Sequence, residues 1–246
     1  MKLFLALFII LISTFLISFC KENEHPAENP VTYVGAYAIS VPEPSGLDLT
    51  YEENGFWTVS DETSTIYKLD NEGNVVSTIK VDGFDFEGIT VIDETTIAIV
   101  LERAREIVIL DTSGTVLKRI KLDLEGELNS GIEGITYNPK NGHFFIVNEK
   151  KPSLLLELND KFEILHIDTL KFSKDVSGIY YDKGNNILWI LSDENQLIVK
   201  TDLNGNPIEK INITIVQPEG ITIDKEGKRL YIVSDNKETL YVFEIN

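Results

Sequence analysis

The pattern of apolar and polar residues repeats five times along this chain. In each repeat a small or acidic residue and a glycine introduce a short apolar run, and a second apolar run follows that ends in acidic or amide residues. The repeated glycines are Gly46, Gly88, Gly134, Gly178 and Gly220, spaced 42, 46, 44 and 42 residues apart. A period near 40 residues in β-rich units is typical of β-propellers.

One repeat is enough to predict the elements of a blade. Apolar blocks such as Ile107–Leu110 are β-branched and suit inner strands buried on both faces, and helical periodicity is nearly absent. Asp111–Gly114 predicts a tight hairpin before the last strand. The fold class is therefore all-β, a five-bladed β-propeller with four-stranded antiparallel blades. In the second repeat the predicted strands are Ile89–Ile92, Thr96–Leu101, Glu106–Asp111 and Thr115–Leu122.

The two ends of the repeat region complement each other. The fifth repeat holds only three strands and finishes with Leu240–Asn246, whereas a spare strand, Tyr33–Ile39, precedes the first repeat. We expect the N-terminal strand to complete the last blade, because this closes the ring and removes exposed edges. The predicted propeller domain spans residues 32–246.

The N-terminal segment has the layout of an export signal. Lys2 is followed by an apolar run from Leu3 to Phe19, slightly short of the ~20 residues of a spanning helix. Cys20, the only cysteine, comes where this run ends, and the sequence before it resembles a bacterial lipobox, although Phe19 is larger than usual there. We expect a signal peptide at 1–19, lipidation of Cys20, a polar tether at 20–31 and an exported protein anchored to the cell envelope, on its periplasmic or surface face. An uncleaved anchor with an incidental cysteine is the alternative.

The net charge of the chain limits the classes of binding partner. The chain carries a formal net charge of −18, which repels phosphate backbones and argues against nucleic acid. Anionic membranes are not attracted either, so we expect membrane contact only through the lipid anchor. Cations are the natural partners of such a surface.

Propeller topology brings the acidic positions to one rim. The residue before each glycine begins the innermost strand, and the antiparallel second strand ends at the same face. The strand-one starts are Ser45, Glu87, Glu133, Ser177 and Glu219. The strand-two ends are Asp61, Glu62, Glu102, Asn148, Glu149, Asp193, Glu194, Asp235 and Asn236.

A ring of carboxylates around one opening favours a bound cation. Two unit charges ~5 Å apart repel by roughly 3 kcal/mol at an effective dielectric near 20, so such a ring either takes up protons or binds a positive ion. Oxygen ligands without histidine select a hard ion, and an irregular ring of many ligands suits calcium better than magnesium. Ordinary turn chemistry at the Glu-Gly pairs and solvated strand ends are the alternatives.

Several short motifs together resemble one family. Phe86–Thr90, Leu101–Arg103, Gly131–Tyr137, Leu191–Glu194 and Gln217–Ile221 are similar to the SdiA-regulated family of bacterial exported proteins, a distant relative of the NHL-repeat propellers. The resemblance implies a five-bladed propeller with a bound calcium and no established activity. It also implies the ligands, which are Glu87, Glu133 and Glu219 first and Glu102 and Glu149 next. Ser45 and Ser177 depart from an all-glutamate ring and leave two sectors open.

Three functions remain open. The first is a binding or scaffold module for a small molecule or an envelope protein, with calcium as a clip or as part of the site. The second is a calcium-dependent hydrolase of lactones or esters, similar to paraoxonase-like and gluconolactonase-like propellers, in which the metal polarises a carbonyl or activates water. No histidine is expected at the rim, so Glu149 or Glu194 would have to be the general base. The third is a purely structural envelope protein.

Overall fold

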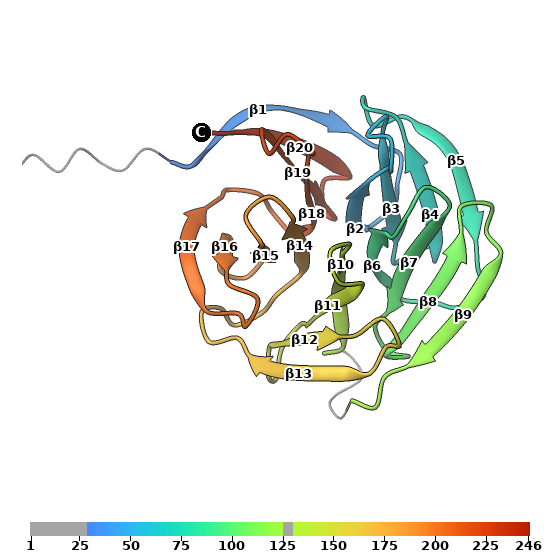
Figure 1. Cartoon of the computed structure of the whole chain (residues 1–246). Coiled ribbons are helices and arrows are strands. Elements are labelled where there is room, and N and C mark those ends of the chain that lie inside the picture. Colours follow the sequence, from blue (N-terminus) through green and yellow to red (C-terminus); the bar gives the residue numbers. More distant parts are fainter. Residues whose placement is uncertain (1–28, 125–129) are drawn as a thin grey trace, which may run out of the picture.

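The chain forms a ring of five antiparallel sheets (Figure 1). The computed structural model describes residues 29–124 and 130–246. Within these residues no helix is long and apolar enough to cross a membrane. The predicted signal peptide and the lipidation site Cys20 lie outside the described residues. The ring confirms the prediction of a five-bladed β-propeller.

Each sheet has four strands, and hydrogen bonding joins them in one order from the channel outward. Blade one contains β2 (Pro44–Leu49), β3 (Phe56–Ser60), β4 (Thr65–Leu69) and β5 (Val75–Lys80). Blade two contains β6 (Phe86–Val91), β7 (Thr96–Leu101), β8 (Glu106–Asp111) and β9 (Val116–Lys121). Blade three contains β10 (Ile132–Asn138), β11 (His143–Asn148), β12 (Leu154–Leu158) and β13 (Ile164–Thr169). Blade four contains β14 (Gly178–Asp182), β15 (Ile187–Ser192), β16 (Leu197–Thr201) and β17 (Pro207–Asn212). Blade five contains β18 (Pro218–Ile223), β19 (Arg229–Ser234), β20 (Thr239–Ile245) and β1 (Val31–Ala38).

The two ends of the chain close the ring, as predicted. Strand β1 pairs antiparallel with β20 along its whole length, from Val31 opposite Ile245 to Ala38 opposite Thr239. The backbone N–H of Asn246 also donates to the carbonyl of Pro30 at 2.9 Å. Strand β1 begins one residue before the predicted domain start at residue 32. The last blade therefore holds only if segments more than 200 residues apart in sequence stay together.

The prediction for blade two is right for its middle strands and wrong for its first. Thr96–Leu101 and Glu106–Asp111 are β7 and β8 as predicted, but β6 begins at Phe86 rather than Ile89. The Glu-Gly pair is therefore part of the inner strand and not a turn before it. This shift matters for the site, because it puts Glu87 inside the paired region of the blade.

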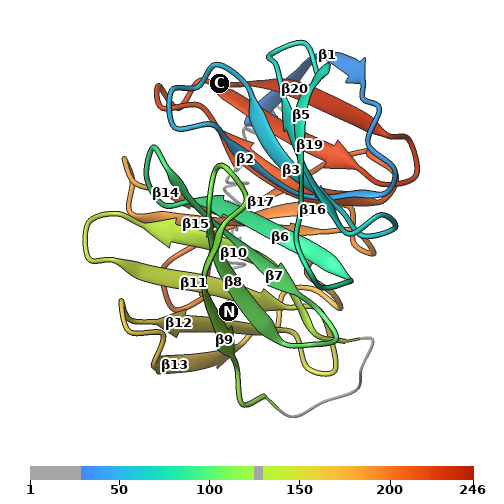
Figure 2. The same ribbon diagram turned by 90° about the vertical axis from the view of Figure 1, so that its right-hand side faces the viewer.

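Neighbouring blades pack face to face around the ring (Figure 2), and clusters of apolar side chains fill the spaces between them. One buried cluster joins Trp57 and Ile66 of blade one to Ile89 and Ile99 of blade two. Trp189 of blade four packs in the same way against blade five. Both tryptophans are thus core residues, and most of the exposed apolar side chains lie on the outermost strands.

Five glycines let the inner strands converge on the axis. A Cβ atom on Gly46 would lie 2.7 Å from the carbonyl oxygen of Glu87, and one on Gly88 would lie 2.9 Å from that of Glu133. A Cβ on Gly178 or Gly220 would approach the backbone of the next blade more closely still. The axial cavity at this level is only about 10 Å³, room for about one water at most. The glycine belt therefore divides the channel into two separate mouths.

The mouth opposite the acidic rim is tied together by Asp48. Its carboxylate accepts the hydroxyls of Thr90 and Thr222, each at 3.1 Å, and the backbone N–H of Val91 at 2.8 Å. These donors come from blades two and five, so one side chain of blade one joins three neighbouring blades. Burial raises the pKa of Asp48 to about 6, even though the hydrogen bonds from these three donors and from the backbone N–H of Leu49 act in the other direction.

The glycine belt makes a testable prediction. Gly220→Ala pushes a methyl group against the backbone of blade one, which cannot move without opening the ring. Overpacking of this kind costs about 1–3 kcal/mol, and we expect the free energy of unfolding in urea to fall by at least about 2 kcal/mol. Gly35→Ala is the matched control, because a Cβ at Gly35 meets nothing within 4 Å. Equal stability of the two variants would contradict the role given to the belt.

Candidate functional site

Three glutamates of the acidic rim sit in β-bulges. Phe86 pairs with Leu101 and Gly88 pairs with Val100, so Glu87 between them has no partner on β7. The same shift leaves Glu133 and Glu219 unpaired in their blades. A bulge bends its strand and re-aims the side chain of the extra residue. In these three blades it turns a glutamate into the mouth of the channel.

Backbone hydrogen bonds bring the ends of the second strands to the same mouth. The N–H of Glu102 donates to the carbonyl of Asp85 at 3.0 Å, and the N–H of Glu149 donates to that of Gly131 at 2.9 Å. Asp61 and Asp235 bond in the same way to residues just before their inner strands. The predicted meeting of strand-one starts and strand-two ends is therefore what the structure shows.

These side chains enclose a cavity of about 230 Å³ whose wall holds ten carboxylates and one ammonium group. Most of the predicted rim residues line it: Ser45, Asp61, Glu87, Glu133, Glu149, Ser177, Asp193, Glu194, Glu219 and Asp235. Glu102 is buried beside it. Glu62 and Asn236 are exposed outside the wall, and the Asn148 amide is turned away to the carbonyl of Pro152 at 3.2 Å.

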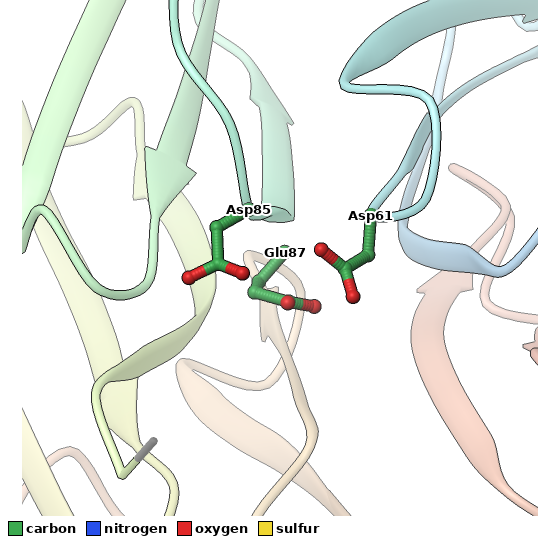
Figure 3. A group of neighbouring side chains, drawn as sticks. All are labelled: Asp61, Asp85 and Glu87. Carbon is green, nitrogen blue, oxygen red and sulfur yellow. The ribbon is translucent and has the colours of Figure 1, made fainter. Parts of the chain in front are cut away.

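Two groups of three carboxylates could each hold a metal ion. The first contains Asp61, Asp85 and Glu87 (Figure 3), and the second contains Glu102, Glu133 and Glu149. In each group one oxygen from every residue lies within 4.8 Å of the others. We call the second group the inner triad, because it includes Glu133. Glu219 belongs to neither group, although it lines the same cavity.

Sequence reasoning missed Glu43, Asp85 and Asp175. Each lies two residues before the start of an inner strand's Ser/Glu-Gly pair, and each is at or beside the cavity. The signal was available, because Glu43 and Asp85 are 42 residues apart, the same spacing as Gly46 and Gly88. Lys150 was missed as well, and nothing in the repeat pattern distinguishes it.

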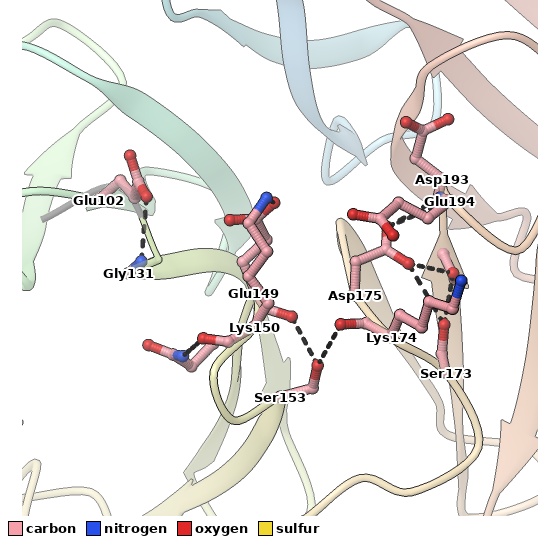
Figure 4. Close-up of polar contacts among 12 residues, drawn as sticks. Glu102, Gly131, Glu149, Lys150, Ser153, Ser173, Lys174, Asp175, Asp193 and Glu194 are labelled. Carbon is pink, nitrogen blue, oxygen red and sulfur yellow. Dashed lines mark hydrogen bonds and ion pairs between the residues drawn. The ribbon is translucent and has the colours of Figure 1, made fainter. Parts of the chain in front are cut away.

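The buried aspartates are held by donors from the loops. Asp85 accepts the backbone N–H of Arg103 at 3.0 Å and forms an ion pair with its Nε at 3.3 Å. Asp175 accepts the Ser192 hydroxyl at 2.6 Å and two backbone N–H groups, those of Asp193 and Glu194, at 2.9 and 3.0 Å (Figure 4). These contacts fix both carboxylates beside the cavity, so they shape its wall.

Burial and mutual repulsion both raise the pKa values of the axial glutamates. Loss of hydration is the larger cause for Glu87, Glu133 and Glu219, and holds the pKa of each well above its usual range. Neighbouring carboxylates add to this, and Glu133 is affected by the charges of Glu87, Glu102, Glu219 and Glu149. No described residue donates a hydrogen bond to the carboxylate of Glu133 or Glu219. Four neighbouring carboxylates therefore repel a negative charge on Glu133.

The histidines lie elsewhere, as expected. Among the described residues, His143 begins β11 at the far end from the cavity, where its Nδ1 is 2.6 Å from Glu157. His166 is on the outermost strand β13. The cavity thus offers oxygen ligands and no imidazole.

Comparisons with known proteins agree with this architecture. The sequence model described as SdiA-regulated matches residues 39–244. A crystal structure of glutaminyl cyclase from Myxococcus xanthus superposes with a TM-score of 0.69 at 13% identity, covering 88% of this chain and 97% of that chain. The β-propeller domain of Cps50 (Swd1) from Myceliophteria thermophila superposes with a TM-score of 0.51 at 10% identity, covering 83% of this chain and 65% of that one. At these identities the two structures share the fold alone.

The raised pKa of Glu133 makes a prediction for the metal-free protein. The folded state holds the Glu133 proton above the ordinary pKa of 4.5, so the folded state binds more protons than the unfolded state and stability falls as pH rises through this window. Glu133→Gln has no titrating carboxyl group at this position, so the variant does not lose this stability as the pH rises. In EDTA we expect its melting temperature to exceed that of the wild type by an amount that grows from pH 4.5 to pH 8.

The control is Glu226→Gln, at an exposed glutamate whose pKa is lowered by Lys228. Its difference from the wild type should not grow with pH. A Glu133→Gln difference that stays constant or shrinks as pH rises would contradict the electrostatic account of the cavity.

Proposed function

The chain belongs to the SdiA-regulated family, and from that premise we propose that its acidic channel mouth binds calcium and that the propeller is a ligand-binding or scaffold module. The observation that carries the proposal is the inner triad, Glu102, Glu133 and Glu149, at a cavity whose wall holds ten carboxylates and one ammonium. Its partner would be a small molecule or an envelope protein.

The residues of the cavity fit a divalent cation. The carboxylate of Glu133 is deep in the wall without a hydrogen-bond donor from any described residue, and unneutralised charge at such depth is unfavourable. A cation of charge two would offset the repulsion among its neighbours directly. Glu102 and Glu149 would complete the ligand set from the ends of β7 and β11. Glu87 on β6 and Glu219 on β18, whose charges also act on Glu133, would contribute as well.

The ligand chemistry selects the ion. Carboxylate oxygens suit hard cations, and the described residues of the cavity wall include no imidazole or thiolate, which disfavours zinc and copper. Calcium accepts six to eight oxygens in irregular geometry, whereas magnesium demands a near-ideal octahedron. Five blades supply oxygens at unequal positions, which favours calcium.

Export and lipidation are part of the same proposal. The apolar run from Leu3 to Phe19, with Cys20 after it, supports delivery to the cell envelope and anchoring through a lipid. Two acyl chains are enough for stable attachment. A low calcium affinity would suit an exported protein, since extracellular calcium modules have Kd values of about 10⁻⁴–10⁻³ M.

A hydrolase remains the second candidate, favoured by one feature of the cavity. Glu194 lines the cavity wall in blade four, next to the blade that carries Glu149, so a carboxylate base could lie beside a substrate on the metal. The described histidines are elsewhere, and Glu194 or Glu149 would have to carry out proton transfer. Turnover of lactones or esters that requires calcium and is lost in Glu194→Gln would establish this function, and a screen without turnover leaves the binding module.

Calcium should stabilise the folded protein. A ligand held only by the folded state adds about 1.4 kcal/mol at ten times its Kd, so millimolar calcium should raise the melting temperature relative to EDTA. Glu133→Gln should abolish the rise, because it removes the central carboxylate, while Glu226→Gln should keep it. Magnesium at equal concentration should give a smaller shift. Calcium without effect on the wild type would remove the proposed site.

A further inference from the structure

Lys150 is the one basic side chain that lines the acidic cavity within the described part of the chain. Its ammonium contacts Oε1 of Glu149, a member of the inner triad (Figure 4). The charges of Glu149, Glu194 and Glu133 all raise the pKa of Lys150, with the hydrogen bond to Glu149 as the largest cause. The cavity thus already contains one positive charge, which belongs to the protein.

The backbone that carries Lys150 is fixed on both sides. The amide of Asn148 donates to the carbonyl of Pro152 at 3.2 Å, and the hydroxyl of Ser153 donates to the carbonyl of Glu149 at 2.7 Å. The N–H of Val176, from the next blade, donates to the same carbonyl at 3.0 Å. The loop therefore holds the base of the lysine at the rim, and only the side chain is left to move.

The lysine has a route out of the cavity. Its side chain is 31% exposed at the mouth, compared with 20% for Glu149. A flexible four-carbon stem lets an ammonium exchange between a carboxylate and water at low cost. The contact is thus of the partly exposed kind, which contributes little to stability.

A cation in the inner triad would compete with this ammonium. The ligand atoms of Glu102, Glu133 and Glu149 lie within 4.8 Å of one another, so an ion bound by them would approach the same carboxylate that Lys150 holds. Two positive charges on one carboxylate repel each other, and the bound lysine also neutralises part of the charge that attracts the ion.

We propose that Lys150 is the resident cation of the acidic cavity and that calcium enters the inner triad only as the Lys150 ammonium leaves Glu149. The inference rests on the calcium site proposed above. The lysine then lowers the apparent calcium affinity, because only the lysine-out fraction is competent to bind. It also couples calcium binding to a change at the cavity mouth, where a ligand of the module would meet the rearranged side chain.

Calorimetric titration of calcium into the purified protein tests the proposal. Lys150→Gln should bind calcium at least about fivefold more tightly than the wild type, the change expected when one unit charge is removed about 8 Å from a divalent ion in water. Lys150→Arg keeps the charge and should bind no more tightly than the wild type. Lys174→Gln is the matched control, since it removes the same charge from an exposed lysine that does not line the cavity. It should change the affinity by less than about twofold.

The outcomes separate this inference from the calcium site itself. Wild-type binding with Lys150→Gln unchanged or weaker would overturn the role of Lys150 and leave the calcium site standing. Equal tightening in Lys150→Gln and Lys174→Gln would also overturn it, because net charge alone would then explain the effect. No binding by the wild type or by either glutamine variant would mean that the calcium site has failed.

Discussion

The close approach of five inner strands at their glycines is the constraint on which the rest of the structure depends. A propeller with five blades has a narrow axis, and only residues without a Cβ allow neighbouring strands to meet there. Gly46 and Gly88 lie against the carbonyls of Glu87 and Glu133, so the residue that each glycine admits is also the residue whose side chain lines the acidic mouth. The packing of the axis and the charge of the cavity have the same origin.

This arrangement produces a cavity that the protein neutralises only in part. Arg103 offsets Asp85 and Lys150 offsets Glu149, whereas Asp175 is held by hydroxyl and backbone donors. Among the described residues, Glu133 and Glu219 have neither an ion pair nor a hydrogen-bond donor of this kind, and their pKa values rise instead. Protonation and cation binding are alternative ways to remove the same repulsion. A hard divalent ion removes the repulsion while the carboxylates stay ionised, and this favours calcium as the occupant of the cavity.

The fold could be read from the sequence because repetition carries it. Five copies of one pattern gave the number of blades, and a missing strand at one end matched a spare strand at the other. The positions facing the mouth followed from antiparallel pairing, which is why Glu87, Glu133 and Glu219 were correctly brought to one cavity. Local geometry was not readable: the Glu-Gly pairs resemble turns, yet they are bulges inside the strands, and this error moved the start of β6 by three residues.

The remaining gaps have related causes. Asp85 and Asp175 share the repeat position two residues before the Glu/Ser-Gly pair, so the spacing could have indicated them, whereas their contacts with Arg103 and Ser192 follow from no periodicity. The amide of Asn148 was expected at the rim, but it serves the loop that carries Lys150. The loop that carries Lys150 occurs in one blade only, so tertiary contacts and not the repeat determine where this lysine lies. A feature that occurs in a single blade cannot be predicted from the sequence pattern that the five blades share.

The most direct test is an anomalous difference map from crystals of the protein grown with calcium. We expect an anomalous peak in the acidic cavity, within the usual calcium–oxygen distance of about 2.3–2.6 Å from carboxylates that include Glu133. In the same crystals the Lys150 ammonium should be withdrawn from Glu149. A well-ordered cavity with no peak at millimolar calcium, and with Lys150 still on Glu149, would contradict calcium binding in this cavity.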